Sequence, residues 1–94
     1  ENLGVLPRGE AGAAAERGEF TLGGRIPVNT SGGLESKGHP LGASGIGQLF
    51  ELVAQLRGEA GDRQVPNARH AIQENGGGLQ GIEEAAAAIH ILSK

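Results

Sequence analysis

The clearest hydrophobic pattern in the chain predicts a helix from about residue 44 or 45 to residue 57. Apolar side chains recur there on one helical face, with Leu52 flanking it; the face consists of Ile46, Leu49, Phe50, Val53 and Leu56. Ser44 is the predicted N-cap, and Arg57 and Gly58 supply a cationic last turn followed by a glycine stop. This helix is therefore the first element that we expect.

The other apolar stretches have less regular patterns. Ile26–Asn29 contains Pro27, which permits an edge strand and not a central one. The segment 68–73 reads as a strand or a helix, and the glycines at 76–78 are expected to end it. For the stretch 85–92, the four alanines favour a helix and the terminal Ile-His-Ile-Leu favours a buried strand. The pattern alone leaves that choice open.

The first 24 residues show no sustained period of either kind. We expect them to form a long loop or an arm that lies on something else, with a histidine-bearing loop, a helix and the final strands in residues 25–94. With 94 residues there is room for one small domain at most. A hydrophobic fraction of 37% and eighteen glycines are a poor basis for an independent core.

Charge and composition narrow the classes of function. The formal net charge of −3 argues against nucleic acid or an anionic membrane as the main partner. No apolar run approaches the roughly 20 residues that span a bilayer. The absence of cysteine excludes a disulfide framework, a thiolate metal site and a cysteine nucleophile within this chain. The chain begins at Glu1 without a signal peptide, so we expect a processed or partial polypeptide and a cytoplasmic location.

The candidate chemistry lies in a glycine-rich loop before the predicted helix, TSGGLESKGHPLGASG, residues 30–45. Pro40 fixes one backbone dihedral and would hold His39 at a loop corner. An imidazole in that place suits a general base or a hydrogen-bond donor. A single loop histidine is more often a surface residue. Phosphate binding is weakly supported, because neither glycine-rich phosphate motif occurs in full.

A longer stretch around this loop resembles a known family. The string VNTSGGLESKGHPLGASGIGQLFELVAQLRGEAGDRQV, residues 28–65, is similar to the histidine segment of thiolases. It most resembles the lipid-transfer-protein-like branch related to sterol carrier protein thiolase and acetyl-CoA acetyltransferase. The residues that match in register are Gly32, Gly33, Gly38, His39, Pro40, Gly42, Ala43, Ser44 and Gly45. The upstream residues also look like that branch, so the resemblance covers nearly the whole chain.

The resemblance implies an α/β fold in which this chain is part of the C-terminal half, a mixed sheet packed with helices, and is incomplete on its own. It also implies that residues 85–92 form a buried strand. His39 would activate a cysteine from the N-terminal half, which attacks an acyl-coenzyme A thioester, and would help to stabilise the charge on the thioester oxygen. A thiol becomes a strong nucleophile as the thiolate, and an adjacent imidazole can accept its proton.

A second family motif, Cys-x-Gly in classical thiolases, is matched by QENGGG at residues 73–78. Gly76 aligns with the glycine whose N–H lines an oxyanion hole, and we expect Gly42 and Ser44 to contribute to substrate binding. Asn75 fits the lipid-transfer branch, whereas Glu74 replaces the second cysteine. Glu74 is either an acid–base group whose pKa is raised by burial, or a solvated loop carboxylate.

The remaining candidates are weaker. His70 and His90 are expected to be structural or exposed, and with His39 they make no recognisable metal set. Glu83 and Glu84 are expected at a solvated strand entry. The arginines at 57, 63 and 69 could touch a coenzyme A phosphate, although a solvated face is the more common role of such residues.

The resemblance implies an acyl-CoA-processing transferase that carries out thiolytic cleavage or Claisen condensation, and the segment alone is expected to be inactive. Three alternatives stay open: a retro-aldolase acting on β-hydroxyacyl-CoA, a non-catalytic acyl-CoA- or lipid-binding or scaffold subunit, and a free-standing small binding protein. Coenzyme A thioester is the expected substrate, without a tightly bound cofactor. The expected partners are the rest of the polypeptide or a complementary subunit, a small OB-fold protein, and further copies in a homo-oligomer.

Overall fold

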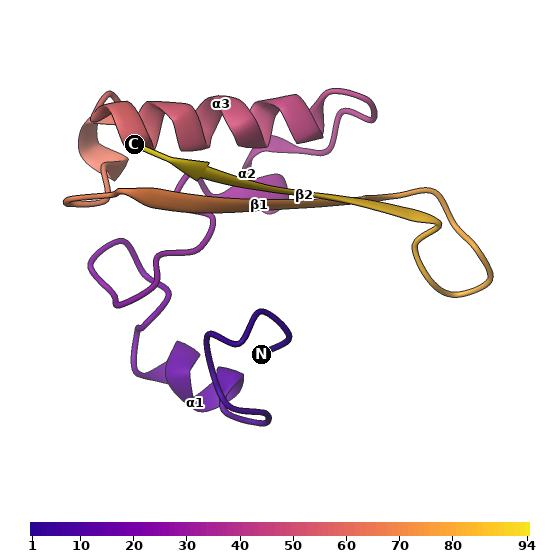
Figure 1. Cartoon of the computed structure of the whole chain (residues 1–94), viewed down its shortest axis with the longest axis horizontal. Coiled ribbons are helices and arrows are strands. Elements are labelled where there is room, and N and C mark those ends of the chain that lie inside the picture. The colour runs from indigo at the N-terminus through magenta and orange to yellow at the C-terminus, as the bar shows by residue number, and fades with distance from the viewer.

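The computed structural model describes residues 1–94 and contains three α-helices, one short 3₁₀ helix and two strands (Figure 1). The elements follow the order α1 (Ala11–Glu16), α2 (Gly33–Lys37), α3 (Ser44–Arg57), η1 (Gly61–Arg63), β1 (His70–Gly77) and β2 (Ala86–Ser93). The long helix α3 lies along one face of the hairpin that β1 and β2 form, whereas α1 lies well apart from it (Figure 1). Neither α1 nor α2 packs on another helix or strand.

Helix α3 confirms the prediction from hydrophobic spacing, with a correction at its first turn. The N-cap residue is Ala43, and Ser44 is already helical; its hydroxyl contacts His39 and the Pro40 carbonyl and makes no cap hydrogen bond. Gly58 ends the helix as predicted: its φ of 78° is readily adopted by glycine, and its N–H bonds the carbonyls of Ala54 and Gln55. The apolar face is only partly covered, since Ile46 is 69% exposed and Phe50 is 73% exposed.

The two strands settle the choices that the pattern left open. β1 pairs with β2 in an antiparallel register from His70 opposite Ser93 to Gly77 opposite Ala86. The predicted α/β class is confirmed, and the part of the sheet that this chain supplies is a two-stranded antiparallel one. Gly76 and Gly77 do not end β1 but belong to it.

The prediction that residues 85–92 are buried is wrong for this chain. β2 forms, but its residues are exposed apart from the half-buried Leu92. The reason is that α3 covers only one face of the hairpin. Ile89 and Ile91 alternate with His90 and so lie on the other face, where they are 58% and 75% exposed.

Three irregular segments also differ from expectation. The predicted strand at 26–29 does not form, although the N–H groups of Ile26 and Val28 bond the carbonyls of Glu19 and Phe20. The expected arm at 1–24 contains the short helix α1, in which Ala14 is buried. The glycine-rich loop contains the short helix α2, preceded by Gly32 at a φ of 90°.

A polar cluster fastens the connecting segments to α3. The buried Gln55 side chain donates through Nε2 to Arg63 O at 2.7 Å and to Thr30 Oγ1 at 3.2 Å, and its Oε1 accepts from the Val65 N–H at 2.8 Å. Glu51, only 6% exposed, accepts from Arg63 Nε at 2.9 Å. The cluster thus ties both the start of the glycine-rich loop and residues 63–65 to one helix.

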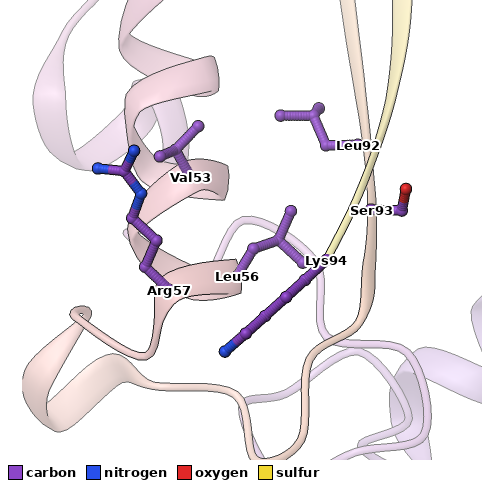
Figure 2. A pocket seen from close by; sticks show the side chains of 6 residues that line it. All are labelled: Val53, Leu56, Arg57, Leu92, Ser93 and Lys94. Carbon is purple, nitrogen blue, oxygen red and sulfur yellow. The ribbon is translucent and has the colours of Figure 1, made fainter.

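A small pocket of about 250 Å³ lies where the C-terminal ends of α3 and β2 meet. Val53 and Leu56 of α3 line it together with Leu92 of β2, and Arg57 and Lys94 complete its rim (Figure 2). Buried apolar residues are few: Ala14, Leu56 and Ala60. None of the helices combines the length and the apolar character that crossing a membrane requires.

Candidate functional site

His39 is held in a short corner between two glycines with left-handed backbone conformations. Gly38 has a φ of 77° and Gly42 a φ of 82°, conformations that most side chains disfavour. The chain between them turns from α2 into the first turn of α3, where the carbonyl of Pro40 accepts the N–H groups of Ala43 and Ser44. The glycines therefore bring the imidazole back to the start of the helix.

The imidazole is oriented by Ser44. His39 Nδ1 lies 2.7 Å from Ser44 Oγ, and the Ser44 hydroxyl donates its single hydrogen to the Pro40 carbonyl at 3.3 Å. We assign the proton of neutral His39 to Nδ1 on this network, because Oγ then serves as the acceptor. This assignment leaves Nε2 with its lone pair free, as a general base requires.

His39 and Ser44 line an open cleft of about 940 Å³ between the first half of α3 and the hairpin. The volume is within the range of small-molecule sites. The lining residues with chemistry to offer, apart from these two, are Gln73, Asn75, Glu84 and His90, together with the backbone at Gly42 and Gly76–Gly78. The structure therefore brings together four of the five site residues that the sequence suggested: His39, Ser44, Gly42 and Gly76.

Two close approaches involve glycines that line the cleft. A Cβ at Gly45 would lie 3.4 Å from Asn75 Cγ, so glycine lets the helix and the asparagine come close together. A Cβ at Gly76 would overlap the carboxyl group of Glu84, which folds over this residue. Glu84, expected at a solvated strand entry, is exposed and also lines the cleft.

Glu74 is the predicted site residue that the structure does not bring to His39. Side chains alternate along a strand, and Gln73 and Asn75 on either side of it face α3 and the cleft. Glu74 points to the opposite face, opposite Ile89 in the register, and is exposed. The burial that would make it an acid–base group is therefore absent in this chain.

Sequence reasoning missed a chain of three polar side chains, two of which, Gln73 and His90, line the same cleft. His90 Nδ1 lies 2.6 Å from Gln73 Oε1, and Gln73 Nε2 donates to Gln48 Oε1 at 2.5 Å. Gln73 is 4% exposed, so its amide is fixed between β2 and α3. The alternation of positions 73 and 75 was the available signal, but the pairing with His90 depends on the hairpin register. No group of three His, Asp or Glu side chains lies close enough to hold a metal ion.

Comparison with known protein families gives a match for the chain that carries this cleft. The family model described as "Thiolase C-terminal domain-like" matches residues 1–94. The chain belongs to this family. The match covers the whole length of the chain and therefore includes the histidine-bearing loop, α3 and both strands.

Three relatives of this thiolase-like chain illustrate the range of its similarity. It is 59% identical to sterol carrier protein 2 of Rattus norvegicus over 75 residues, which are 80% of this chain and 14% of that protein. It is 52% identical to the acetyl-CoA acetyltransferase of Methanothermobacter thermautotrophicus over 94 residues, 100% of this chain and 24% of that protein. It is 40% identical to benzoylsuccinyl-CoA thiolase subunit BbsB of Thauera aromatica over 79 residues, 83% of this chain and 20% of that protein.

The thiolase-like chain thus spans between 14% and 24% of the length of these relatives. The predicted membership of the thiolase superfamily is confirmed, and the similarity to both sterol carrier protein 2 and an acetyl-CoA acetyltransferase agrees with the lipid-transfer-protein-like branch.

Proposed function

We propose that this chain is the histidine-bearing segment of a thiolase-like enzyme that transfers acyl groups from coenzyme A thioesters. The observation that carries the proposal is the contact of 2.7 Å between His39 Nδ1 and Ser44 Oγ; with the proton assigned to Nδ1, Nε2 is available as a proton acceptor in the lining of the cleft. The relative named acetyl-CoA acetyltransferase, which is similar over the full length of this chain, supports the substrate class.

The proposed reaction needs a thiol from outside these residues, since the chain has no cysteine. His39 Nε2 takes the thiol proton, and the thiolate attacks the acyl carbonyl carbon. Coenzyme A leaves as the thiolate with the electron pair of the broken C–S bond and takes the proton from His39, which leaves the acyl group on the enzyme thiol. The backbone N–H of Gly76 is the proposed donor to the carbonyl oxygen as negative charge develops on it. Gly42 and Ser44 shape the side of the cleft next to His39.

The exposure of the chain supports a covering partner, either the rest of a longer polypeptide or a complementary subunit. Its accessible surface is 6962 Å², whereas a folded monomer of 9.5 kDa is expected to expose about 5,000 Å². The excess includes apolar side chains on the outer hairpin face, among them Ile72, Ile89 and Ile91. We therefore place the nucleophile and most of the coenzyme A contacts on that partner.

The test is an acyl-transfer assay on the complete enzyme, meaning this chain together with the polypeptide that supplies the thiol. Acetoacetyl-CoA is offered with free coenzyme A, and wild type is compared with His39→Ala. Thiolysis that falls at least a hundredfold in the variant supports the proposal. Equal rates in the two proteins, or complete inactivity of wild type towards acyl-CoA thioesters, would refute it.

A second candidate is a retro-aldolase that cleaves β-hydroxyacyl-CoA. It is favoured by one observation: residues 73–78 contain no second thiol, and the cleft presents imidazole and amide groups instead. Cleavage of a β-hydroxyacyl thioester without consumption of free coenzyme A would support it over the transferase. Stoichiometric binding of acyl-CoA without turnover of either substrate would favour the binding or scaffold role.

A further inference from the structure

We propose that His90, oriented by the buried amide of Gln73, is the second acid–base group of the cleft. This inference rests on the proposed function and assigns a residue to the role that a carboxylate at Glu74 was expected to fill. It starts from the finding that Glu74 and the cleft lie on opposite faces of β1, whereas His90 lines the cleft.

The contact with Gln73 sets the orientation of His90. Gln73 Nε2 donates to Gln48 Oε1 at 2.5 Å, so its other atom, Oε1, faces His90 Nδ1 at 2.6 Å. An amide oxygen only accepts, and the proton of a neutral His90 is therefore on Nδ1. Nε2, on the other side of the ring, keeps its lone pair, as Nε2 of His39 does.

The position of Gln73 makes this orientation rigid. Gln73 is 4% exposed and is held between α3 and β2, with hydrogen bonds to both. When Nε2 of His90 takes a proton, the bond from Nδ1–H to Gln73 Oε1 becomes charge-assisted and stronger. The Gln73 amide can therefore stay bonded to Nδ1–H of His90 whether or not Nε2 carries a proton.

The other charged or titratable groups that line the cleft are His39 and Glu84. The side chains that α3 contributes to the lining are those of Ser44, Ile46 and Leu49, none of them charged. The hairpin adds Gln73 and Asn75, which are neutral. The lining of the cleft thus includes two imidazoles, each with Nδ1 bound to an acceptor, and one carboxylate.

Cleavage of a β-ketoacyl thioester begins with neutral His39 and with His90 protonated at Nε2. The external thiolate, deprotonated by His39, adds to the β-carbonyl, and the bond between the α- and β-carbons breaks. The electron pair goes to the α-carbon, which takes a proton from Nε2–H of protonated His90 and leaves as the shorter thioester. The thiol of free coenzyme A then gives its proton to His90, and the resulting thiolate attacks the acyl-enzyme carbonyl. The enzyme thiolate leaves with the electron pair of the broken C–S bond and takes its proton back from His39, so that both imidazoles return to their starting states.

The test compares His90→Gln, His39→Ala and Glu74→Gln in the complete enzyme, by steady-state thiolysis of acetoacetyl-CoA over a range of pH. We expect His90→Gln to lower kcat about a hundredfold, to leave KM within about twofold, and to remove one limb of the pH profile. Glu74→Gln, on the other face of β1, is expected to stay near wild type. A His90→Gln enzyme with wild-type kcat and both limbs would overturn the proposal.

Gln73→Glu separates a chemical role from a structural one, because it leaves the imidazole in place. A carboxylate against Nδ1 favours the protonated ring, so the limb that His90 controls is expected to move to higher pH. An unmoved limb would count against His90. Failure of this inference is distinguishable from failure of the proposed function: in the first case only the His90 and Gln73 variants behave as wild type, and in the second His39→Ala does so as well.

Discussion

The imidazole of His39 and the hydroxyl of Ser44 are joined through Nδ1 and Oγ at 2.7 Å, across a corner that the glycines at 38 and 42 make possible. With the hydroxyl hydrogen assigned to the bond with the Pro40 carbonyl, the serine acts on the histidine as an acceptor. Ser44 thus has no part in capping α3 and instead fixes which imidazole nitrogen is free. Ser44, predicted as the N-cap of this helix, therefore orients His39 instead.

Replacing Ser44 tests this relationship. We expect Ser44→Ala to lower kcat about tenfold, because the imidazole loses the acceptor that selects its tautomer. Ser44→Thr keeps a hydroxyl at the same position and is expected to remain within about twofold of wild type. Steady-state kinetics of the complete enzyme provide the measurement. Equal losses in Ala and Thr variants would show that the hydroxyl is not what matters.

The glycines of α3 are expected to respond differently to alanine. Gly47→Ala should raise the free energy of unfolding by about 0.5–1 kcal/mol, because alanine favours a helix and its Cβ meets nothing within 4 Å. Gly45→Ala should gain less or lose stability, since its Cβ would lie 3.4 Å from Asn75 Cγ. Denaturant unfolding of the two variants gives the comparison. A larger gain at Gly45 than at Gly47 would contradict the close contact between α3 and β1.

The ion pair between Glu51 and Arg63 predicts a loss of stability in acid. The hydrogen bond from Arg63 holds the pKa of the Glu51 carboxyl below its ordinary value, and Gln55 acts in the same direction. A carboxyl whose pKa is lowered by folding contributes stability above its unfolded pKa of about 4.3. That contribution disappears as the pH falls through the lower pKa of the folded state.

We expect Glu51→Gln to reduce the free energy of unfolding at neutral pH by about 1–2 kcal/mol, a modest value because Arg63 is about half exposed. The difference from wild type should shrink as the pH drops below about 4. Glu59→Gln, at an exposed position without an ion pair, is the control. A Glu51→Gln deficit that stays constant into acid would contradict the role of the carboxylate.

We expect the buried side-chain amide of Gln55 to contribute more to the free energy of unfolding than an exposed amide does. Gln55→Leu leaves the Val65 N–H and the Arg63 carbonyl without their partner, and we expect a loss of about 2–3 kcal/mol in the free energy of unfolding. Gln80→Leu, on the exposed connection between the strands, should change it by less than about 0.5 kcal/mol. Similar effects of the two substitutions would mean that the cluster does not hold residues 63–65.

The sequence was sufficient for the features that depend on local spacing. Helix α3 follows from apolar positions three and four residues apart and from Gly58 at its end. His39 was found through its flanking motif, GHPLGASG, and not through its own chemistry. Local propensity failed at β2, where the alanines favour a helix, because the strand exists through pairing with β1.

The rest of the site depends on register and on layers that no local pattern reveals. Whether Glu74 or Asn75 faces the cleft is decided by a single residue of register, because alternate side chains lie on opposite faces. The contact between Gln73 and His90 spans 17 residues of sequence and exists only when these two positions are paired. The burial expected for β2 presupposes a layer on its outer face, which this chain does not itself supply.

The central claim is that His39 activates a thiol supplied from outside this chain, and the rate of acyl-enzyme formation tests it most directly. The complete enzyme is mixed rapidly with acetyl-CoA, quenched and examined by intact mass for a covalent acetyl adduct. We expect wild type to acylate, His39→Ala to do so at least a hundredfold more slowly, and added imidazole to restore part of the rate. Acylation at the wild-type rate in His39→Ala would contradict the account.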